Sequence, residues 1–239
     1  MQRQKRDKKK IIHSPPRNPA LKGADEGGSV STYNRPRSLD RLSRRLIIGV
    51  TGSFGSGKTT VARLFQSNQA RIIDADRLAH QCTKRASPAY KKIIAIFKRG
   101  ILKDNMAIDR KKLAKIVFNN RALAARLNNI IHPEVIRAIK DKIKKYRSGL
   151  IVLDAPLLIE AGLEKIIDKL VVVKLTRDKQ VKRIQKRNSI SRADILKRIK
   201  FQIPLRQKLR LADFIINNSG GLTKTKKQVA GIRRLLWKS

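Results

Sequence analysis

A glycine-rich stretch at residues 46–60, LIIGVTGSFGSGKTT, constrains the fold of this chain more than any other feature. It opens with the apolar and largely β-branched run Leu46–Val50, and a helix-like pattern begins near its end. Gly52 is followed, after four residues, by the triplet Gly57–Thr59, which is the spacing of a loop that binds the phosphates of a nucleoside triphosphate. A dinucleotide-binding loop would need glycine where Phe54 stands, so that alternative is excluded.

The chemistry of phosphate binding explains why these residue types occur at this spacing. Glycines allow the backbone to curl so that successive N–H groups point at phosphate oxygens, and the following helix N-terminus adds a partial positive charge. Lys58 is expected to reach the β- and γ-phosphates, and the Thr59 hydroxyl is expected to bind Mg²⁺. The predicted nucleotide-binding residues are Gly52, Ser53, Phe54, Gly55, Ser56, Gly57, Lys58, Thr59 and Thr60.

Strand-like and helix-like patterns alternate along the rest of the chain. The expected strands are Leu46–Val50, Arg71–Asp74, Leu150–Asp154, Lys169–Leu175 and Phe214–Ile216. Continuous apolar runs of this kind suit a parallel sheet that is covered on both faces. With the phosphate-binding loop after the first strand, they predict a doubly wound α/β sheet of about five strands that binds its ligand at the carboxyl edge.

The region of about residues 87–147 is expected to be a helical insertion, because it contains no good strand. Its predicted helices are Tyr90–Phe97, Arg110–Asn119, Ala122–Ile131 and Pro133–Tyr146. Further helices are expected over residues 58–67, around Val181, and over Lys226–Trp237. Ser191 with Asp194 fits a capping box that opens the next helix. Pro204 is expected to break or restart that helix.

Composition bounds the class of protein. A chain of 239 residues has room for one large α/β domain. Its 58 Lys and Arg against 17 Asp and Glu give a formal charge of +41, which attracts polyanions nonspecifically. Because the basic residues are spread along the whole chain, a solvated basic surface is favoured over a dedicated nucleic-acid site.

The single cysteine, Cys82, permits no internal disulfide and suits a reducing compartment. No apolar run is long enough for a membrane span, so we expect a cytoplasmic protein.

Residues 1–45 differ from the rest of the chain. They contain four prolines and 13 basic against 4 acidic residues, without sustained apolar periodicity. This composition predicts a disordered basic arm, and binding of RNA or a membrane stays open as an alternative role.

The few acidic residues are placed informatively. Asp74 and Asp76 follow the second strand, where a carboxylate can accept a proton from an attacking hydroxyl, hold the Mg²⁺ shell or cap a helix. We expect Asp74 mainly to cap and Asp76 mainly to act as a base. Asp154 ends another strand and is either a second acid near the metal or a buried acid bonded to backbone N–H groups. Glu160 is either a groove residue or a helix surface charge, and the surface charge is favoured.

Phosphoryl transfer also needs cations around the migrating group. Arg183 and Arg187 are four residues apart on a predicted helix, so they share one face. Arg192 and Arg206 flank the next helix. The histidines and the cysteine have no metal-ligand spacing.

From Leu46 to Asn218, the chain resembles the dephospho-coenzyme A kinases, which have the P-loop kinase fold. The resemblance rests on the order of the loop and the phrases IDAD at 73–76, ILKDNMAIDRKKLAKIVF at 101–118, LNNIIHP at 127–133, LDAPLLIEAGL at 153–163 and ADFIINN at 212–218. The IDAD and PLLIE phrases together separate this family from adenylate and shikimate kinases. Ser53 stands where the family usually has a second glycine, which requires that its φ be negative.

The resemblance implies transfer of the γ-phosphoryl group of ATP to the ribose 3′-hydroxyl of dephospho-CoA, with ATP and Mg²⁺ as cofactors. It implies Asp76 as the base, Lys58 and Arg187 as further catalytic residues, and Mg²⁺ on Thr59, with Asp154 or Asp76 binding it directly or through water. The implied acceptor-binding residues are Asp74, Asp76, His132 and Glu160. The kinase domain would span residues 46–239, with the helical insertion gripping dephospho-CoA and residues of about 187–206 closing as a lid.

Two other functions remain open at this stage. One is a different small-molecule or nucleoside kinase with the same fold. The other is a nucleic-acid-binding protein with a vestigial loop, although the low aromatic content of 4% argues against surfaces that stack on single strands.

Overall fold

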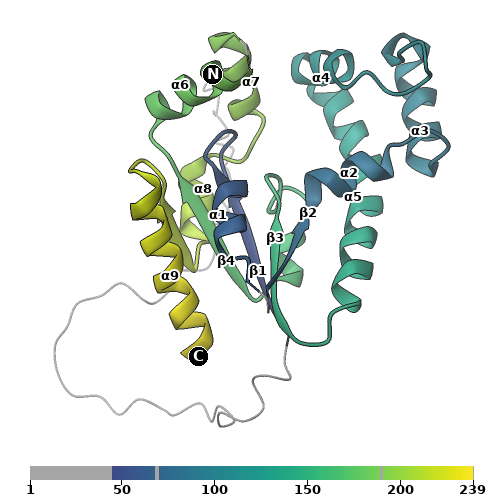
Figure 1. Cartoon of the computed structure of the whole chain (residues 1–239). Coiled ribbons are helices and arrows are strands. Elements are labelled where there is room, and N and C mark those ends of the chain that lie inside the picture. The colour runs from purple at the N-terminus through teal and green to yellow at the C-terminus, as the bar shows by residue number, and fades with distance from the viewer. Residues whose placement is uncertain (1–44, 68–69, 189–190, 239) are drawn as a thin grey trace, which may run out of the picture. The chain divides into compact units, whose positions relative to one another are not determined.

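The computed structural model describes residues 45–67, 70–188 and 191–238; the side chains of residues 187, 188, 237 and 238 are outside this description. Figure 1 shows the arrangement of the helices and strands. The predicted basic arm lies outside the described residues except for Arg45, which begins the first strand.

The centre of the fold is a five-stranded parallel sheet with the order β2-β3-β1-β4-β5. Its strands are β1 (Arg45–Gly52), β2 (Ala70–Asp74), β3 (Gly149–Asp154), β4 (Lys169–Lys174) and β5 (Phe214–Asn217). The predicted strands and the doubly wound α/β class are therefore confirmed. The strand that carries the phosphate-binding loop lies in the middle of the sheet, so its carboxyl end is surrounded by those of its neighbours.

Alternating side chains of the strands supply the two cores of the fold. Ile47 belongs to the apolar cluster that includes α2 (Ala75–Cys82), α5 (Arg121–Lys144) and α8 (Leu205–Arg210). Ile48 belongs to the opposite cluster, with α1 (Lys58–Leu64) and α9 (Leu222–Lys238). The helices therefore cover both faces of the sheet, as Figure 1 shows.

The helices that follow α2 in the connection from β2 to β3 have an apolar cluster of their own. They comprise α3 (Pro88–Phe97), the short 3₁₀ turn η1 (Arg99–Ile101), α4 (Arg110–Asn119) and the first half of α5. Seven buried residues form this cluster: Tyr90, Ile93, Ile101, Ile108, Leu113, Val117 and Leu127. We call α3, η1, α4 and this half of α5 the helical segment. Its separate cluster explains how it holds its shape beside the sheet.

The two helices expected over Ala122–Ile131 and Pro133–Tyr146 are one, because α5 runs through Pro133 without a break. Proline removes a backbone donor and collides with the preceding turn, at a cost of about 3 kcal/mol. Apolar residues anchor the helix on both sides of that point: Leu127 in the cluster of the helical segment, and Val135 and Ile139 in the core of the sheet. Burial at both ends outweighs the local penalty.

The remaining predicted helices are present, although α9 begins at Leu222, four residues before the predicted start. The helix that contains Val181 is α6 (Arg177–Asn188). Ser191 caps α7 (Arg192–Lys200): its hydroxyl oxygen accepts the Asp194 N–H at 3.1 Å. Pro204 immediately precedes α8. A 3₁₀ turn, η2 (Leu163–Ile166), lies before β4. Within the described residues, no helix combines the length and the apolar character that a membrane span requires.

Candidate active site

The glycine-rich loop joins β1 to α1 and depends on two left-handed glycines. Gly55 and Gly57 have φ of 76° and 87°, a region that side chains disfavour. A Cβ on Gly55 would lie 2.5 Å from Cδ1 of Ile184, and one on Gly57 would collide with the Asn218 side chain. Ser53 is not among the positive-φ residues, as its side chain requires. Both glycines therefore serve the loop conformation and the close packing around it.

Two glutamine side chains that the sequence analysis missed hold the tip of the loop. Gln180 on α6 is buried, and its Nε2 donates to Oγ of Ser53 at 2.9 Å and to the backbone oxygen of Phe54. Oε1 of Gln202 accepts the N–H of Phe54 at 2.7 Å. Nothing in the spacing of glutamines along the sequence predicts these contacts, because they depend on how α6 and α7 fold back over the loop.

The other side of the loop is fixed from β5. Nδ2 of Asn218, which follows this strand, donates to the backbone oxygen of Ser56 at 2.8 Å. Oγ1 of Thr225 donates to Oδ1 of Asn218 at 2.9 Å, which sets the orientation of the amide. Asn218 ends the ADFIINN phrase, so its position at the carboxyl edge of the sheet was predictable, whereas its contact with the loop was not.

The two aspartates after β2 have different surroundings. Oδ1 of Asp74 accepts the N–H of Arg77 at 2.9 Å, so Asp74 is the cap of α2. Asp76 lies in the first turn of that helix and is not its cap. The structure thus assigns the capping role to Asp74 and leaves the carboxylate of Asp76 available to the cleft.

A lysine and two carboxylates perturb one another beside the loop. Burial lowers the pKa of Lys58, and the negative charges of Asp154 and Asp76 oppose this shift. Burial raises the pKa of Asp76, against the opposing charge of Lys58. Burial also raises the pKa of Asp154, against a hydrogen bond donated by the Thr59 hydroxyl. Shifts of this kind are characteristic of groups that handle protons or charged ligands.

Asp154 and Thr59 form an oxygen-rich corner that suits Mg²⁺. Asp154 is only 4% exposed, its Oδ1 has no hydrogen-bond partner among the described residues, and its carboxylate accepts a hydrogen bond from the Thr59 hydroxyl. Mg²⁺ prefers one or two carboxylate or hydroxyl ligands completed by water and phosphate oxygens. The described residues contain no group of three or more acidic, histidine or cysteine side chains that could cage a metal. The donors present therefore fit a magnesium ion held jointly with nucleotide phosphates.

Most of the predicted nucleotide-binding residues line a cavity of about 680 Å³. Six of them contribute to it: Phe54, Gly55, Gly57, Lys58, Thr59 and Thr60. Gly52, Ser53 and Ser56 are buried and are not among its lining residues. The predicted catalytic Arg187 is on α6, but its side chain is outside the described residues. Arg183, the other arginine expected near the phosphates, lines the cavity with Lys186.

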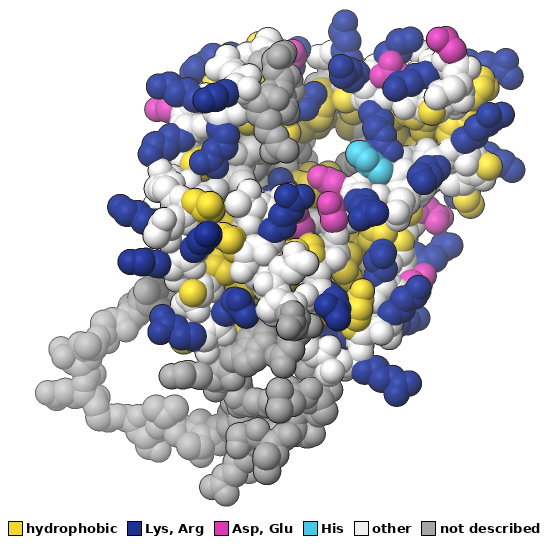
Figure 2. All heavy atoms as spheres, in the orientation of Figure 1, with side chains coloured by type: hydrophobic (Ala, Val, Ile, Leu, Met, Phe, Trp, Pro, Cys, Tyr) yellow, Lys and Arg dark blue, Asp and Glu magenta, His cyan; other side chains and the backbone are white. Residues whose placement is uncertain are grey.

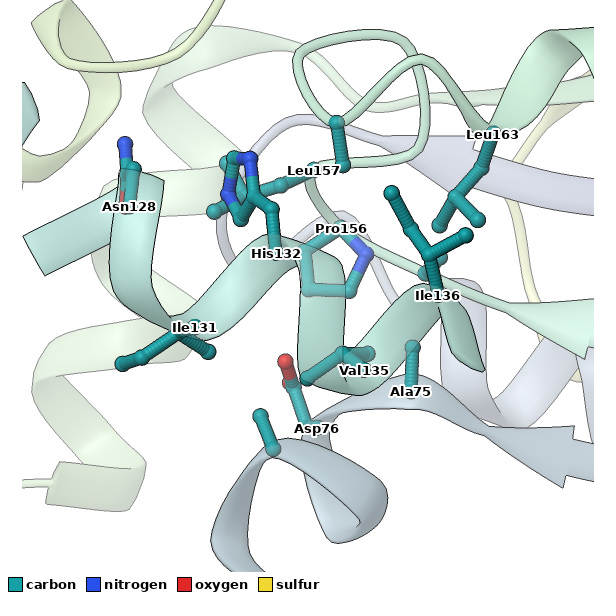
Figure 3. A pocket seen from close by; sticks show the side chains of 13 residues that line it. Ala75, Asp76, Asn128, Ile131, His132, Val135, Ile136, Pro156, Leu157 and Leu163 are labelled. Atoms are coloured by element: carbon teal, nitrogen blue, oxygen red, sulfur yellow. The ribbon is translucent and has the colours of Figure 1, made fainter. Parts of the chain in front are cut away.

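A second cavity of about 180 Å³ lies beside the first and is mainly apolar. Its apolar lining includes Ala75, Ala79, Ile131, Val135, Ile136, Leu157 and Leu163. His132 and Asn128 contribute polar groups from α5, and burial lowers the pKa of His132, which favours a neutral imidazole. In Figure 3, the Asp76 side chain points from α2 into the space framed by α5 and Pro156. Asp76 and Pro156 line both cavities, so one carboxylate faces both spaces.

Glu160 differs from both interpretations of the sequence. Its side chain is 14% exposed and forms an ion pair of 2.8 Å with the fully buried Lys208. Its Oε1 also accepts the N–H of Ile203 at 2.9 Å. The expectation of a helix surface charge is therefore wrong, because the carboxylate is needed to pair a buried ammonium group. Neither Glu160 nor Asp74 lines either cavity.

The surface around the site is strongly basic. Figure 2 shows Lys and Arg side chains spread over the visible face, whereas a small group of acidic side chains lies together beside a hollow. This distribution agrees with a generally basic surface on that face rather than one basic stripe.

Comparison with known proteins gives one consistent result. A family model described as dephospho-CoA kinase matches residues 46–224. A dephospho-CoA kinase of Carboxydothermus hydrogenoformans is 45% identical over 196 residues, which are 80% of this chain and 95% of that protein. One of Bacillus licheniformis is 42% identical over 187 residues, which are 77% of this chain and 93% of that protein.

Solved structures share this fold, and one of them is named as a dephospho-CoA kinase. The crystal structure of TT1252 from Thermus thermophilus has a TM-score of 0.69 at 28% identity and covers 82% of this chain and 98% of that one. Dephospho-CoA kinase from Campylobacter jejuni has a TM-score of 0.59 at 29% identity, with coverages of 81% and 98%. A shikimate kinase from Acinetobacter baumannii, at 15% identity with a TM-score of 0.50 and coverages of 82% and 96%, shares the fold alone. With the loop, the sheet order and these relatives in agreement, the chain belongs to the dephospho-CoA kinase family.

Proposed function

We propose that this protein transfers the γ-phosphoryl group of ATP to the 3′-hydroxyl of the ribose of dephospho-CoA, which yields CoA and ADP in the last step of coenzyme A biosynthesis. The observation that carries the assignment of the site is the carboxylate of Asp76, which lines both the loop cavity and the apolar cavity. A base for phosphoryl transfer must reach the acceptor hydroxyl while that oxygen faces the γ-phosphorus, and a position between the two cavities supports this role for Asp76. Family membership supports the choice of acceptor.

In the proposed step, the triphosphate lies in the larger cavity and the acceptor hydroxyl approaches from the smaller one. Asp76 accepts the hydroxyl proton as the oxygen attacks the γ-phosphorus, and the bond to the β–γ bridging oxygen breaks to release ADP. Because burial raises the pKa of Asp76, its carboxylate is a stronger base than an ordinary aspartate. The ammonium group of Lys58 and the guanidinium group of Arg183 offset charge on the phosphates, and Arg187 is proposed to assist them.

The corner formed by Thr59 and Asp154 is proposed to hold Mg²⁺, with Asp76 as an alternative ligand through water. When bound, the ion would neutralise phosphate charge. The ion's charge would offset the cost of burying the Asp154 carboxylate, whose Oδ1 has no hydrogen-bond partner in the part of the chain that the structure describes.

The acceptor is proposed to lie between the sheet and the helical segment, and the insertion of about residues 87–147 is proposed to bind it. His132, at the wall of the smaller cavity, is a proposed acceptor contact. Glu160 is proposed to act indirectly, because its carboxylate is engaged by Lys208. Residues of about 187–206 are proposed to close as a lid within a kinase domain of residues 46–239. Closure would limit the access of water, and thereby hydrolysis of ATP.

The choice of acceptor is tested by a coupled assay for ADP release with dephospho-CoA, adenosine, AMP and shikimate in parallel. Of the four acceptors, we expect only dephospho-CoA to be turned over efficiently. Lys58→Ala should lose turnover because the loop loses its phosphate-binding cation. A higher kcat/KM with another acceptor would make the protein a different small-molecule kinase. Full turnover by Lys58→Ala would remove phosphate binding by the loop from the account.

A further inference from the structure

One residue of the phosphate-binding loop is held at three points by elements that follow it much later in the chain. The N–H of Phe54 donates to Oε1 of Gln202 at 2.7 Å, and its backbone oxygen accepts from Nε2 of Gln180. Its ring lies 5.4 Å from the guanidinium carbon of Arg198. Gln202 and Arg198 both come from α7 and its C-terminal end, so this part of the chain contacts both the backbone and the ring of Phe54.

The guanidinium group of Arg198 also contacts the helical segment. It lies over the ring of Phe118 on α4, 5.3 Å from the centroid. Phe118 makes an edge contact with Phe201, with the ring centroids 5.2 Å apart and the planes at 73°. Arg198 is therefore shared between an aromatic ring of the loop and one of the helical segment.

The chemistry of arginine suits this shared position. A guanidinium group is planar and weakly hydrated, so it stacks on aromatic faces while keeping its charge. Neither Arg198 nor Gln202 is among the described residues that line the two cavities. Phe54, which both residues contact, does line the larger one and so connects them to the proposed nucleotide site.

We infer that Arg198 and Gln202 are positioning residues that act through Phe54 to hold the loop ready for ATP and to join α7 to both substrate sites. The inference rests on the proposed function. When α7 lies on Phe54 and Phe118 together, the loop is fixed and the helical segment is in place. Loss of the contacts between Arg198 and the rings of Phe54 and Phe118 weakens ATP binding. It also allows more ATP to be cleaved when no acceptor is bound.

The test compares full-length variants in two measurements: ATP affinity by calorimetry without acceptor, and steady-state ADP release with and without dephospho-CoA. The variants are Arg198→Met, which keeps side-chain length without charge, Phe54→Leu, which removes the ring, and the double variant. Phe54→Tyr keeps the ring. Lys200→Met removes an exposed charge from the same helix and is the matched control.

We expect Arg198→Met and Phe54→Leu each to weaken ATP binding about tenfold, the upper part of the range for an interaction of this kind. The fraction of ADP formed without acceptor should rise in both, while kcat at saturation changes much less than KM for ATP. The double variant should be no worse than either single variant, because both remove the same contact. Phe54→Tyr, which keeps the ring, should weaken ATP binding less than Phe54→Leu does. Lys200→Met should behave as the parent protein, and Gln202→Leu should resemble Phe54→Leu.

Two results would overturn the inference. A large fall in kcat in Arg198→Met with unchanged ATP affinity, additive with Phe54→Leu, would mean that Arg198 contacts the phosphoryl group itself. A lower melting temperature with unchanged ATP affinity and acceptor dependence would make the contacts merely structural. The proposed function fails separately, since it requires that the parent protein turn over dephospho-CoA, whereas the calorimetric comparison needs no acceptor.

Discussion

Asp74 and Asp76 show how two identical side chains, two positions apart, acquire different roles. Asp74 ends β2 and satisfies a backbone donor of α2, so its oxygens serve the helix. Asp76 is the second residue of α2 and lines two cavities instead. Spacing after a strand predicted that these acids would lie at the carboxyl edge. The choice between cap and base needed the backbone geometry.

The hydrogen bonds that amide side chains make to the loop could not be predicted from the sequence. Gln180, Gln202 and Asn218 act across large sequence separations, and their positions have no local signature. By contrast, Lys58 and Thr59 were predictable because the loop itself fixes their geometry. Residues that belong to a local motif can thus be identified from sequence, whereas residues that support it from other elements cannot.

Asp154 gives a prediction about stability at the residue scale. Because its pKa is raised in the folded protein, the charged form destabilises the fold at pH values above the ordinary carboxyl pKa, and this cost vanishes once both states are protonated. Asp154→Asn should therefore raise the melting temperature at pH 7; each 1 kcal/mol gained would appear as roughly 2–4 °C in a domain of this size. The gain should disappear as the pH falls below about 4.

Thermal melts of Asp154→Asn from pH 3 to pH 8 provide the measurement. Asp141→Asn, at an exposed position on α5, serves as the control and should leave the melting temperature unchanged. A lower melting temperature of Asp154→Asn at pH 7 would show that the charged carboxylate stabilises the fold, contrary to this account.

At the scale of elements, apolar runs located the five strands to within two residues. This succeeded because strands of a parallel sheet are buried on both faces, so each one is continuously apolar. The helix α5 was predicted less well. It was expected as two helices, and what makes it one is burial on both sides of Pro133, which depends on partners that are distant in sequence.

The loop yields a prediction at the same scale. Gly57→Ala places a Cβ at a φ of 87° and against the Asn218 side chain, so we expect ATP binding to weaken about tenfold or more, given a strain of roughly 1–2 kcal/mol. Calorimetric titration with ATP measures this. Gly231→Ala in α9 is the matched control, because no atom lies within 4 Å of the added Cβ. Unaltered ATP affinity in Gly57→Ala would contradict the phosphate-binding role of this loop conformation.

At the scale of the whole molecule, the fold places two cavities around one carboxylate. The larger is built from the loop, α6 and the end of β5, and the smaller from α2, α5 and the turn after β3. No single element contains the site, and it exists because the parallel strands end together at one edge of the sheet. The central claim is therefore that Asp76 prepares the acceptor oxygen while the loop holds ATP.

The most direct measurement of this claim is the single-turnover rate of Asp76→Asn with ATP and dephospho-CoA bound, with the 3′-phosphomonoester product identified by phosphorus NMR. The account predicts a fall in rate of about 10²–10⁴-fold, the usual contribution of a general base, with ATP binding largely kept. A loss smaller than about tenfold would contradict it, because the group removed would then not be the base.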